Sequence, residues 1–184
     1  MKKLPLVLVL LIGFAGIIFA WEPDDLTKFP SCMNEKSVIL NFGIGHDFGA
    51  NIGGNYIYVP PIRLSFDFNA ALGEKKLPFF FGGLVGFHGR GEKRVYFDSY
   101  LNLGFRVGYH FNWAVDNLDT YAVTTTGWRV YTGDRKNKSF TVGDLFIFDV
   151  LIGARWFIND FFGFWAETGY SPFSWFNIGV AFKF

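Results

Sequence analysis

The sequence alternates hydrophobic and polar residues in one segment after another, and this period of two constrains the fold more than any other feature. From Ile62 to Asn69 every even position is a large hydrophobic residue and every odd position is polar. The same pattern runs from Leu101 to Trp113 and from Phe176 to Phe184. Successive side chains of a β-strand point to opposite faces. Each segment is therefore predicted to be a strand with one apolar and one more polar face.

Segments of this kind recur along the chain and are separated by residues that favour turns, mainly Gly, Asn, Asp and Pro. The fifth segment separates its two faces least clearly. No linker or repeat divides the chain, so we predict one domain over 37–184, preceded by an irregular segment over 21–36. The eight predicted strands cover roughly residues 37–48, 58–69, 78–88, 95–111, 120–131, 142–157, 162–170 and 174–184.

Two observations indicate which face points into the barrel and which points outward. The less apolar face carries many glycines, which weaken a water-facing strand but make room for long side chains inside a narrow barrel. The apolar face is rich in aromatic residues, with Trp and Tyr near strand ends, as in the girdles of a membrane barrel. A soluble barrel of the lipocalin type is the structural alternative. The glycines are Gly43, Gly45, Gly104, Gly108, Gly153, Gly163, Gly169 and Gly179, and the girdle residues are Tyr58, Tyr96, Tyr109, Trp113, Tyr131, Trp156 and Tyr170.

The first twenty residues have the layout of a secretory signal peptide. Lys2 and Lys3 precede an apolar run from Leu4 to Ala20, after which the chain becomes acidic. Cleavage after Ala20 and cleavage after Ala15 both remain open, and a retained membrane anchor is the alternative. After this run no apolar stretch is long enough for a spanning helix, so the chain is predicted to cross a membrane with strands. Strands can do so only as a closed barrel that satisfies every backbone polar group.

Composition excludes several other classes of protein. The formal net charge is +1, which argues against a nucleic-acid partner. Charged residues make up 18% and aromatic residues 21% of the chain, which is unlike a disordered protein. The single cysteine, Cys32, has no partner for an intramolecular disulfide.

A signal peptide, an even number of amphipathic strands and a final strand that ends in Phe184 resemble the small OmpA/OmpX-type outer-membrane barrels. The resemblance implies an all-β, up-and-down antiparallel transmembrane barrel of eight strands in the cell outer membrane. The chain end also resembles the signal that the β-barrel assembly machinery recognises. Its apolar positions are Phe176, Ile178, Val180, Phe182 and Phe184.

An eight-stranded barrel is only wide enough for its own side chains to fill, so we expect a plugged lumen. Charged residues on the inward face must pair, because an unpaired buried charge is costly. A turn at 159–160 would place Arg155 opposite Trp165 and diagonal to Glu167, so we predict an Arg155–Glu167 ion pair. The other candidates for lumen ion pairs are Arg63, Asp67, Asp98, Arg106 and Asp149.

The three histidines do not form a predicted metal site, and no cofactor is expected. His88 and His110 fall at opposite ends of neighbouring strands, and His46 lies on a different part of the sheet. Some eight-stranded outer-membrane barrels are enzymes that modify lipid A, but neither motif is recognisable here. His46 and Asp47 are adjacent, so in a strand they point to opposite faces. We therefore predict no catalytic residues and no enzyme activity.

The prediction is an integral outer-membrane barrel with a structural or surface-interaction role, acting as a monomer among outer-membrane lipids. One alternative is OmpW-like passage of small hydrophobic molecules, for which Ile39 and Leu84 would supply an apolar lumen near the outer mouth. A second is a lipid A-modifying enzyme. Arg135, Lys136 and Lys138 give one loop a positive charge that suits lipopolysaccharide phosphates.

Overall fold

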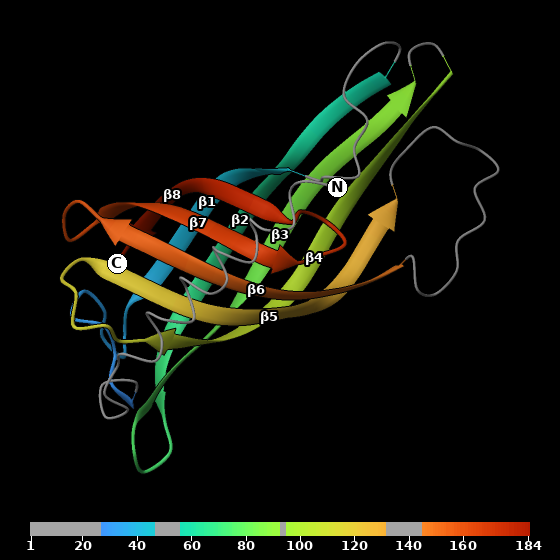
Figure 1. The fold of residues 1–184 in the computed structure, drawn as a ribbon. Coiled ribbons are helices and arrows are strands. Elements are labelled where there is room, and N and C mark those ends of the chain that lie inside the picture. Colours follow the sequence, from blue (N-terminus) through green and yellow to red (C-terminus); the bar gives the residue numbers. More distant parts are fainter. Residues whose placement is uncertain (1–26, 47–55, 93–94, 132–144) are drawn as a thin grey trace, which may run out of the picture.

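Eight antiparallel strands close into a barrel in the computed structural model, which describes residues 27–46, 56–92, 95–131 and 145–184 (Figure 1). Each strand pairs with the next, and β8 pairs with β1 to close the sheet. Among the described residues, no helix is long and apolar enough to cross a membrane. The strands are β1 (Val38–His46), β2 (Tyr56–Leu72), β3 (Leu77–Glu92), β4 (Tyr96–Phe111), β5 (Leu118–Tyr131), β6 (Phe146–Phe157), β7 (Phe162–Tyr170) and β8 (Phe176–Lys183).

The strand positions agree with the sequence prediction to within four residues. The end of β3 differs by four residues, because the strand continues to Glu92 rather than ending at 88, and the β2–β3 hairpin also differs. The predicted strands ended at 69 and began at 78, whereas β2 continues to Leu72 and β3 begins at Leu77. Ala70 and Ala71 interrupt the alternation, so the sequence pattern stops before the pairing does. Gly73 closes the turn with a φ of 73°, a conformation that glycine adopts without steric cost.

The two ends of the barrel differ. The turns 73–76, 112–117 and 158–161 lie at the end where β1 begins and β8 finishes, here called the terminal end. The opposite end, here called the loop end, holds the turn 171–175 and the connections through 47–55, 93–94 and 132–144. There β2, β3 and β4 extend beyond β7 and β8 (Figure 1). The predicted lipopolysaccharide contacts Arg135, Lys136 and Lys138, and the signal segment 1–20, lie outside the described residues.

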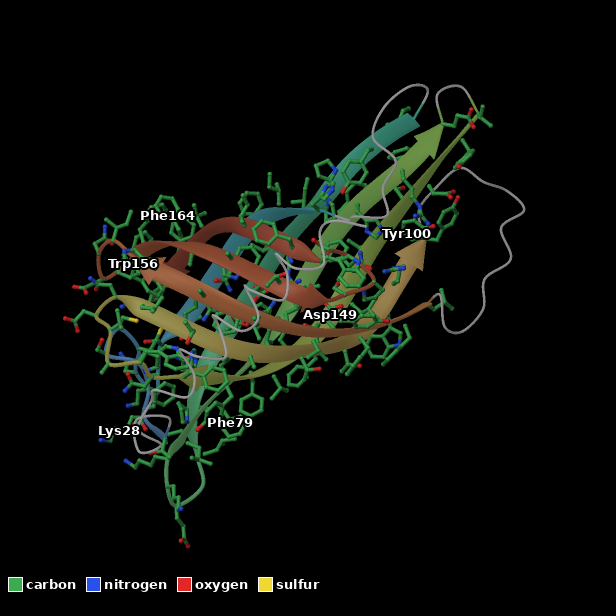
Figure 2. All side chains as sticks on the ribbon, in the orientation of Figure 1. Lys28, Phe79, Tyr100, Asp149, Trp156 and Phe164 are labelled. Atoms are coloured by element: carbon green, nitrogen blue, oxygen red, sulfur yellow. The ribbon has the colours of Figure 1, made fainter. Side chains whose placement is uncertain are left out.

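Exposure is inverted relative to a soluble barrel. Phe66 and Phe105 are each 54% exposed, whereas Arg63, Arg106 and Arg155 are 0% exposed. Trp156 and Phe164, which Figure 2 labels, also lie on the outer surface. The predicted orientation, with the apolar face outward and the charged face inward, is therefore confirmed. Every strand contributes at least one exposed hydrophobic residue to the outer surface. Examples in strand order are Phe42, Phe66, Val85, Phe105, Trp128, Phe148, Phe164 and Ile178.

The proposed aromatic girdle needs correction at the tyrosines near the loop end. The strand register places Tyr96 and Tyr58 on the face of Asp98, because Tyr96 precedes Asp98 by two residues in β4 and Tyr58 pairs with Arg90, the strand partner of Asp98. Tyr131 was predicted on the outer face, but its hydroxyl donates a hydrogen bond of 2.7 Å to Asp98, which is 4% exposed. Tyr131 therefore faces the lumen. The fifth predicted strand gave the least clear faces because its inward side also carries the apolar residues Tyr121 and Val123.

Glycines on the inward face make room for aromatic rings, as predicted. A methyl group added at Gly43 would overlap the Trp165 ring and the carbonyl of Ile178, and one at Gly153 would overlap the Tyr121 ring. Both rings are buried in the lumen.

The described part of the predicted irregular segment has no regular secondary structure, yet it packs against the terminal end. Met33 is 7% exposed, and the Asn69 side chain donates to the Asn34 carbonyl at 3.0 Å. Lys183 donates to the Cys32 carbonyl at 2.7 Å. Residues 27–37 thus cover this end of the lumen.

Candidate functional site

A network of buried charges fills the lumen. Its side chains come from strands on all sides of the barrel, and each is at most 1% exposed. The charged members are Arg63, Asp67, Arg106, Asp119, Asp149, Arg155 and Glu167, together with His110.

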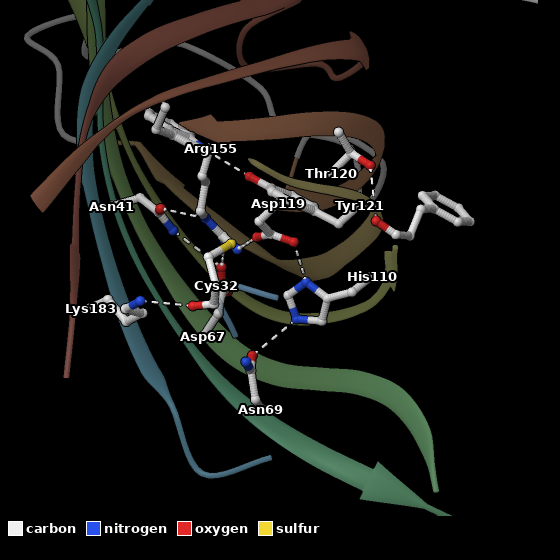
Figure 3. A network of polar contacts seen from close by, with 12 residues as sticks. Cys32, Asn41, Asp67, Asn69, His110, Asp119, Thr120, Tyr121, Arg155 and Lys183 are labelled. Carbon is white, nitrogen blue, oxygen red and sulfur yellow. Dashed lines mark hydrogen bonds and ion pairs between the residues drawn. The ribbon is translucent and has the colours of Figure 1, made fainter. Parts of the chain in front are cut away.

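Arg155 is the centre of the part of the network nearer the terminal end (Figure 3). Its Nε donates to Asn41 Oδ1 at 2.9 Å, and its Nη1 donates to Asp119 Oδ2 at 2.7 Å. Its Nη2 donates to Asp67 Oδ2. The guanidinium lies 4.1 Å from the centroid of the Tyr121 ring, a cation–π distance. All three guanidinium nitrogens therefore have a partner. We call Asn41, Asp67, Asn69, His110, Asp119 and Arg155 the Arg155 tier.

His110 has a polar partner at each ring nitrogen. Its Nδ1 lies 2.6 Å from Asp119 Oδ1, and its Nε2 lies 3.0 Å from Asn69 Oδ1. The Asn69 nitrogen donates to the Asn34 carbonyl, so the Asn69 oxygen must accept from His110. His110 therefore connects Asp119 on β5 with Asn69 on β2 inside the lumen.

A second group of charges lies toward the loop end. Arg106 Nη2 is 2.6 Å from Glu167 Oε1, and Arg63 Nη2 is 3.2 Å from Glu167 Oε2. Arg63 Nη1 lies 3.9 Å from Asp149 Oδ2. Thr125 is the strand partner of both Arg106 and Asp149, and Asn177 is the strand partner of Glu167. We call Arg63, Arg106, Thr125, Asp149, Glu167 and Asn177 the Arg63 tier. Asp67 connects the two tiers, because Arg106 Nε also lies 3.1 Å from its Oδ1.

The predicted Arg155–Glu167 ion pair is wrong. Arg155 is the strand partner of Trp165, as expected, but its guanidinium reaches Asp67 on β2 and Asp119 on β5 instead. The Tyr121 ring contacts Arg155, while its hydroxyl donates to Glu167 Oε1 at 2.8 Å. The prediction considered only neighbours within the sheet, whereas long side chains in a narrow barrel pair across the lumen.

The structure brings most of the predicted ion-pair candidates together, with Asp98 as the exception. Arg63, Asp67, Arg106 and Asp149 belong to the network. Asp98 lies toward the loop end, opposite Arg90 on β3, where one of its contacts is a hydrogen bond donated by Tyr131.

Sequence reasoning missed several members of the network. Asp119 precedes the predicted start of the fifth strand at 120, so it was not assigned to the inward face. His110 was considered only as a metal ligand. Period two places Asp119 and Tyr121 on one face, which is the signal that could have found them. No group of three or more His, Cys, Asp or Glu residues in the described ranges could hold a metal ion.

The turn between β7 and β8 covers the loop end of the lumen. Phe173 is 2% exposed, and its ring centroid lies 5.2 Å from that of His88. Arg129 Nη2 donates to the Pro172 carbonyl at 2.8 Å. Ser171 Oγ accepts from the backbone N–H of Phe173 at 3.1 Å and of Ser174 at 3.2 Å. Side chains and short chain segments thus close both ends.

The apolar outer mouth that the alternative of hydrophobic passage would require is not formed by Ile39 and Leu84. Ile39 is 0% exposed but pairs with Lys183 at the terminal end. Leu84, 3% exposed, lies near the middle of β3. The two residues therefore do not line one mouth.

Cys32 sits at the terminal end beside the Arg155 tier. Burial, together with the charge of Asp119, raises the pKa of the Cys32 thiol to about 12. The thiol is therefore neutral at physiological pH and a poor nucleophile.

Among solved structures, the chain is similar to a designed protein described as "De novo design of transmembrane beta-barrels". The TM-score is 0.44 and the sequence identity 13%, over 83% of this chain and 98% of the designed chain. No protein-family model matches the sequence, and no curated protein matches it.

Proposed function

We propose that this chain is an integral outer-membrane β-barrel with a lumen closed by its own side chains, and that its role is structural or in surface interaction. The observation that carries the proposal is the inverted exposure. Phe66 is 54% exposed on the outer face, while its neighbours Ser65 and Asp67 are 0% exposed in the lumen.

Water is a poor solvent for such a surface. Exposed apolar area costs roughly 25 cal/mol per Å², and soluble monomers rarely show apolar patches above a few hundred Å². Here hydrophobic residues are exposed on all eight strands. Lipid tails remove that cost, and closure of β1 on β8 leaves no unpaired sheet edge along the paired residues.

The two ends support an orientation in the membrane. Outer-membrane barrels have short periplasmic turns and longer outer loops. The turns 73–76, 112–117 and 158–161 share the end where β8 finishes, whereas β5 and β6 are joined through 132–144 at the other end. We therefore assign the terminal end to the periplasm. The predicted signal peptide over 1–20 would suit this orientation.

The proposal includes specific partners. The outward residues of β8, among them Phe176 and Ile178, together with Phe184, which follows the strand, would present the assembly signal to the β-barrel assembly machinery. Arg135, Lys136 and Lys138 would meet lipopolysaccharide phosphates. No catalytic activity and no cofactor are assigned, and the protein would act as a monomer.

Arginine substitutions on the outer face test the lipid contact. In lipid vesicles, Phe66→Arg should lower the free energy of unfolding by about 2–4 kcal/mol relative to Phe66→Ala, since a cation at the bilayer midplane is costly. The Ala variant corrects for lost packing of the Phe66 ring over Gly83. Val115→Arg, in the turn 112–117 and 41% exposed before substitution, should cost about 0–1 kcal/mol. Equal small effects at both positions would overturn the membrane assignment, as would recovery of the protein without detergent.

Conductance measurements separate the closed barrel from the alternative of hydrophobic passage. The purified full chain in a planar bilayer should show no conductance steps, because both tiers and both end segments occupy the lumen. Release of a lipophilic dye from vesicles that depends on the protein would instead favour passage of small hydrophobic molecules.

A further inference from the structure

The two tiers of the lumen differ in how well their polar atoms are satisfied. In the Arg155 tier, Asn41 donates from Nδ2 to Ser65 Oγ and Asp67 Oδ2, each at 3.1 Å, and accepts from Arg155 at 2.9 Å. In the Arg63 tier, neither amide atom of Asn177 has a hydrogen-bond partner among the described residues. The same holds for the Thr125 hydroxyl and for Nε of Arg63.

These atoms are fully enclosed. Asn177, Thr125 and Arg63 are all 0% exposed. Buried polar atoms in folded proteins are nearly always hydrogen-bonded, either to protein or to ordered water, and a buried water typically makes about three such bonds. Donors and acceptors both occur here, since Asn177 offers one of each kind and Arg63 offers a donor. That mixture is what a water molecule requires.

The net charge of the Arg63 tier indicates whether water or an ion would bind to these atoms. Within the Arg63 tier, Arg63 and Arg106 balance Asp149 and Glu167. A neutral tier offers no net attraction to an added anion or cation, so a neutral hydrogen-bonding occupant is favoured.

The cover over this tier is well defined. A methyl group at Gly86 would overlap the Phe173 ring, and Gly86 is the strand partner of Arg63. A methyl group at Gly45 would meet Ser174 Oγ and Asn177 Oδ1. Phe173 and Ser174 therefore lie directly over Arg63 and Asn177. On the other side, the Arg155 tier separates these residues from the terminal end. In that tier only Asp67 Oδ1 lacks a hydrogen bond among the described residues, and it lies 3.1 Å from Arg106 Nε.

We propose that the Arg63 tier binds ordered water, held by Asn177, Thr125 and Arg63 and enclosed by Phe173. The outer half of the lumen is then a sealed hydrated chamber, while the Arg155 tier is dry. This assignment concerns the lumen alone and applies to the protein in detergent micelles as well as in lipid.

Water–protein cross-relaxation NMR on the full chain in micelles tests the proposal. The side-chain amide protons of Asn177 should show cross-relaxation with long-lived water, whereas those of Asn41 should show none. Asn41 is a matched control, because it is also 0% exposed and also lies near a serine hydroxyl, that of Ser65. The hydroxyl near Asn177 is that of Ser174. If water magnetisation merely passed through a neighbouring serine hydroxyl, both asparagines would show the signal. Equal behaviour of the two side chains, with or without water contact, would overturn the proposal.

Substitutions in the covering turn test the seal. In the Phe173→Ala variant, the water at Asn177 should exchange rapidly with bulk solvent. The cross-relaxation between water and the Asn177 side-chain amide protons should then change toward the value for free water. Trp175→Ala, in the same turn but 44% exposed before substitution, should leave it unchanged. Identical exchange in both variants and the parent chain would show that Phe173 does not enclose the chamber.

Discussion

Replacement of Arg155 by methionine should destabilise the barrel strongly, and the loss should be coupled to Asp119 rather than to Glu167. Methionine keeps a long apolar side chain but removes the three hydrogen bonds to Asn41, Asp67 and Asp119. Hydrogen bonds to charged groups contribute about 1.5–3 kcal/mol each, which sets an upper limit of roughly 9 kcal/mol.

The actual loss should be smaller because two of the acceptors keep other partners. Asp119 remains bonded to His110, and Asp67 remains bonded to Asn41 and close to Arg106. We therefore expect a loss of about 3–5 kcal/mol, the range found when one partner of a buried ion pair is removed. Against a total stability of about 5–15 kcal/mol, this is readily measured.

A double-mutant cycle identifies the partner. Asp119→Asn combined with Arg155→Met should show a coupling energy of about 1–3 kcal/mol. Glu167→Gln combined with Arg155→Met should show less than about 1 kcal/mol, because the two side chains are linked only indirectly, through Tyr121 and through Asp67 with Arg106. Urea unfolding followed by tryptophan fluorescence in lipid vesicles gives each value, and Arg155→Lys is a milder variant if methionine prevents folding. This account of the network would be refuted if the losses from Arg155→Met and Asp119→Asn were additive. It would also be refuted if the coupling energy of Arg155→Met with Glu167→Gln were the larger of the two.

Three further expectations follow from the same contacts. Gly43→Ala should lower the free energy of unfolding by about 1–3 kcal/mol in the same urea assay, because the new methyl group overlaps the Trp165 ring and the Ile178 carbonyl; an unchanged midpoint would contradict this packing. The rate of Cys32 alkylation should rise about tenfold per pH unit from pH 7 to 10 without a plateau, because the thiol pKa is raised to about 12. Folding favours this neutral thiol, so its contribution to stability is present below pH 9.0, the ordinary pKa, and is lost as the pH rises toward 12. Deletion of Phe184 should reduce the amount of folded protein in outer-membrane fractions, and unchanged levels on immunoblots would argue against the proposed assembly signal.

The strands were predictable because the alternation of faces is a local property. Ile62 to Asn69 alone defines an outward apolar face and an inward polar face, and the structure places Phe66 outside and Arg63 inside. The prediction failed where strand pairing continues beyond the alternation of hydrophobic and polar residues. At Ala70 and Ala71 the residues no longer alternate, yet they pair with Phe79 and Pro78 of β3.

The lumen residues were predictable as a set but not as pairs. Period two assigns Arg63, Arg106, Arg155 and Glu167 to one face, so their burial together follows from barrel closure. Their partners depend on how far each side chain reaches across the lumen. Tyr121 on β5 illustrates this, since it contacts both Arg155 and Glu167.

The amino-acid order by itself determined the strands, the inward and outward faces and the residues available to the lumen, because side-chain direction in a strand depends only on position along the chain. The tertiary structure decided which charges pair and that Phe173 and residues 27–37 cover the two ends. It also decided that the side chains of Asn177 and Thr125 have no hydrogen-bond partner among the described residues. These features depend on distances across a closed barrel, between residues far apart in sequence, and such distances exist only once β8 has paired with β1.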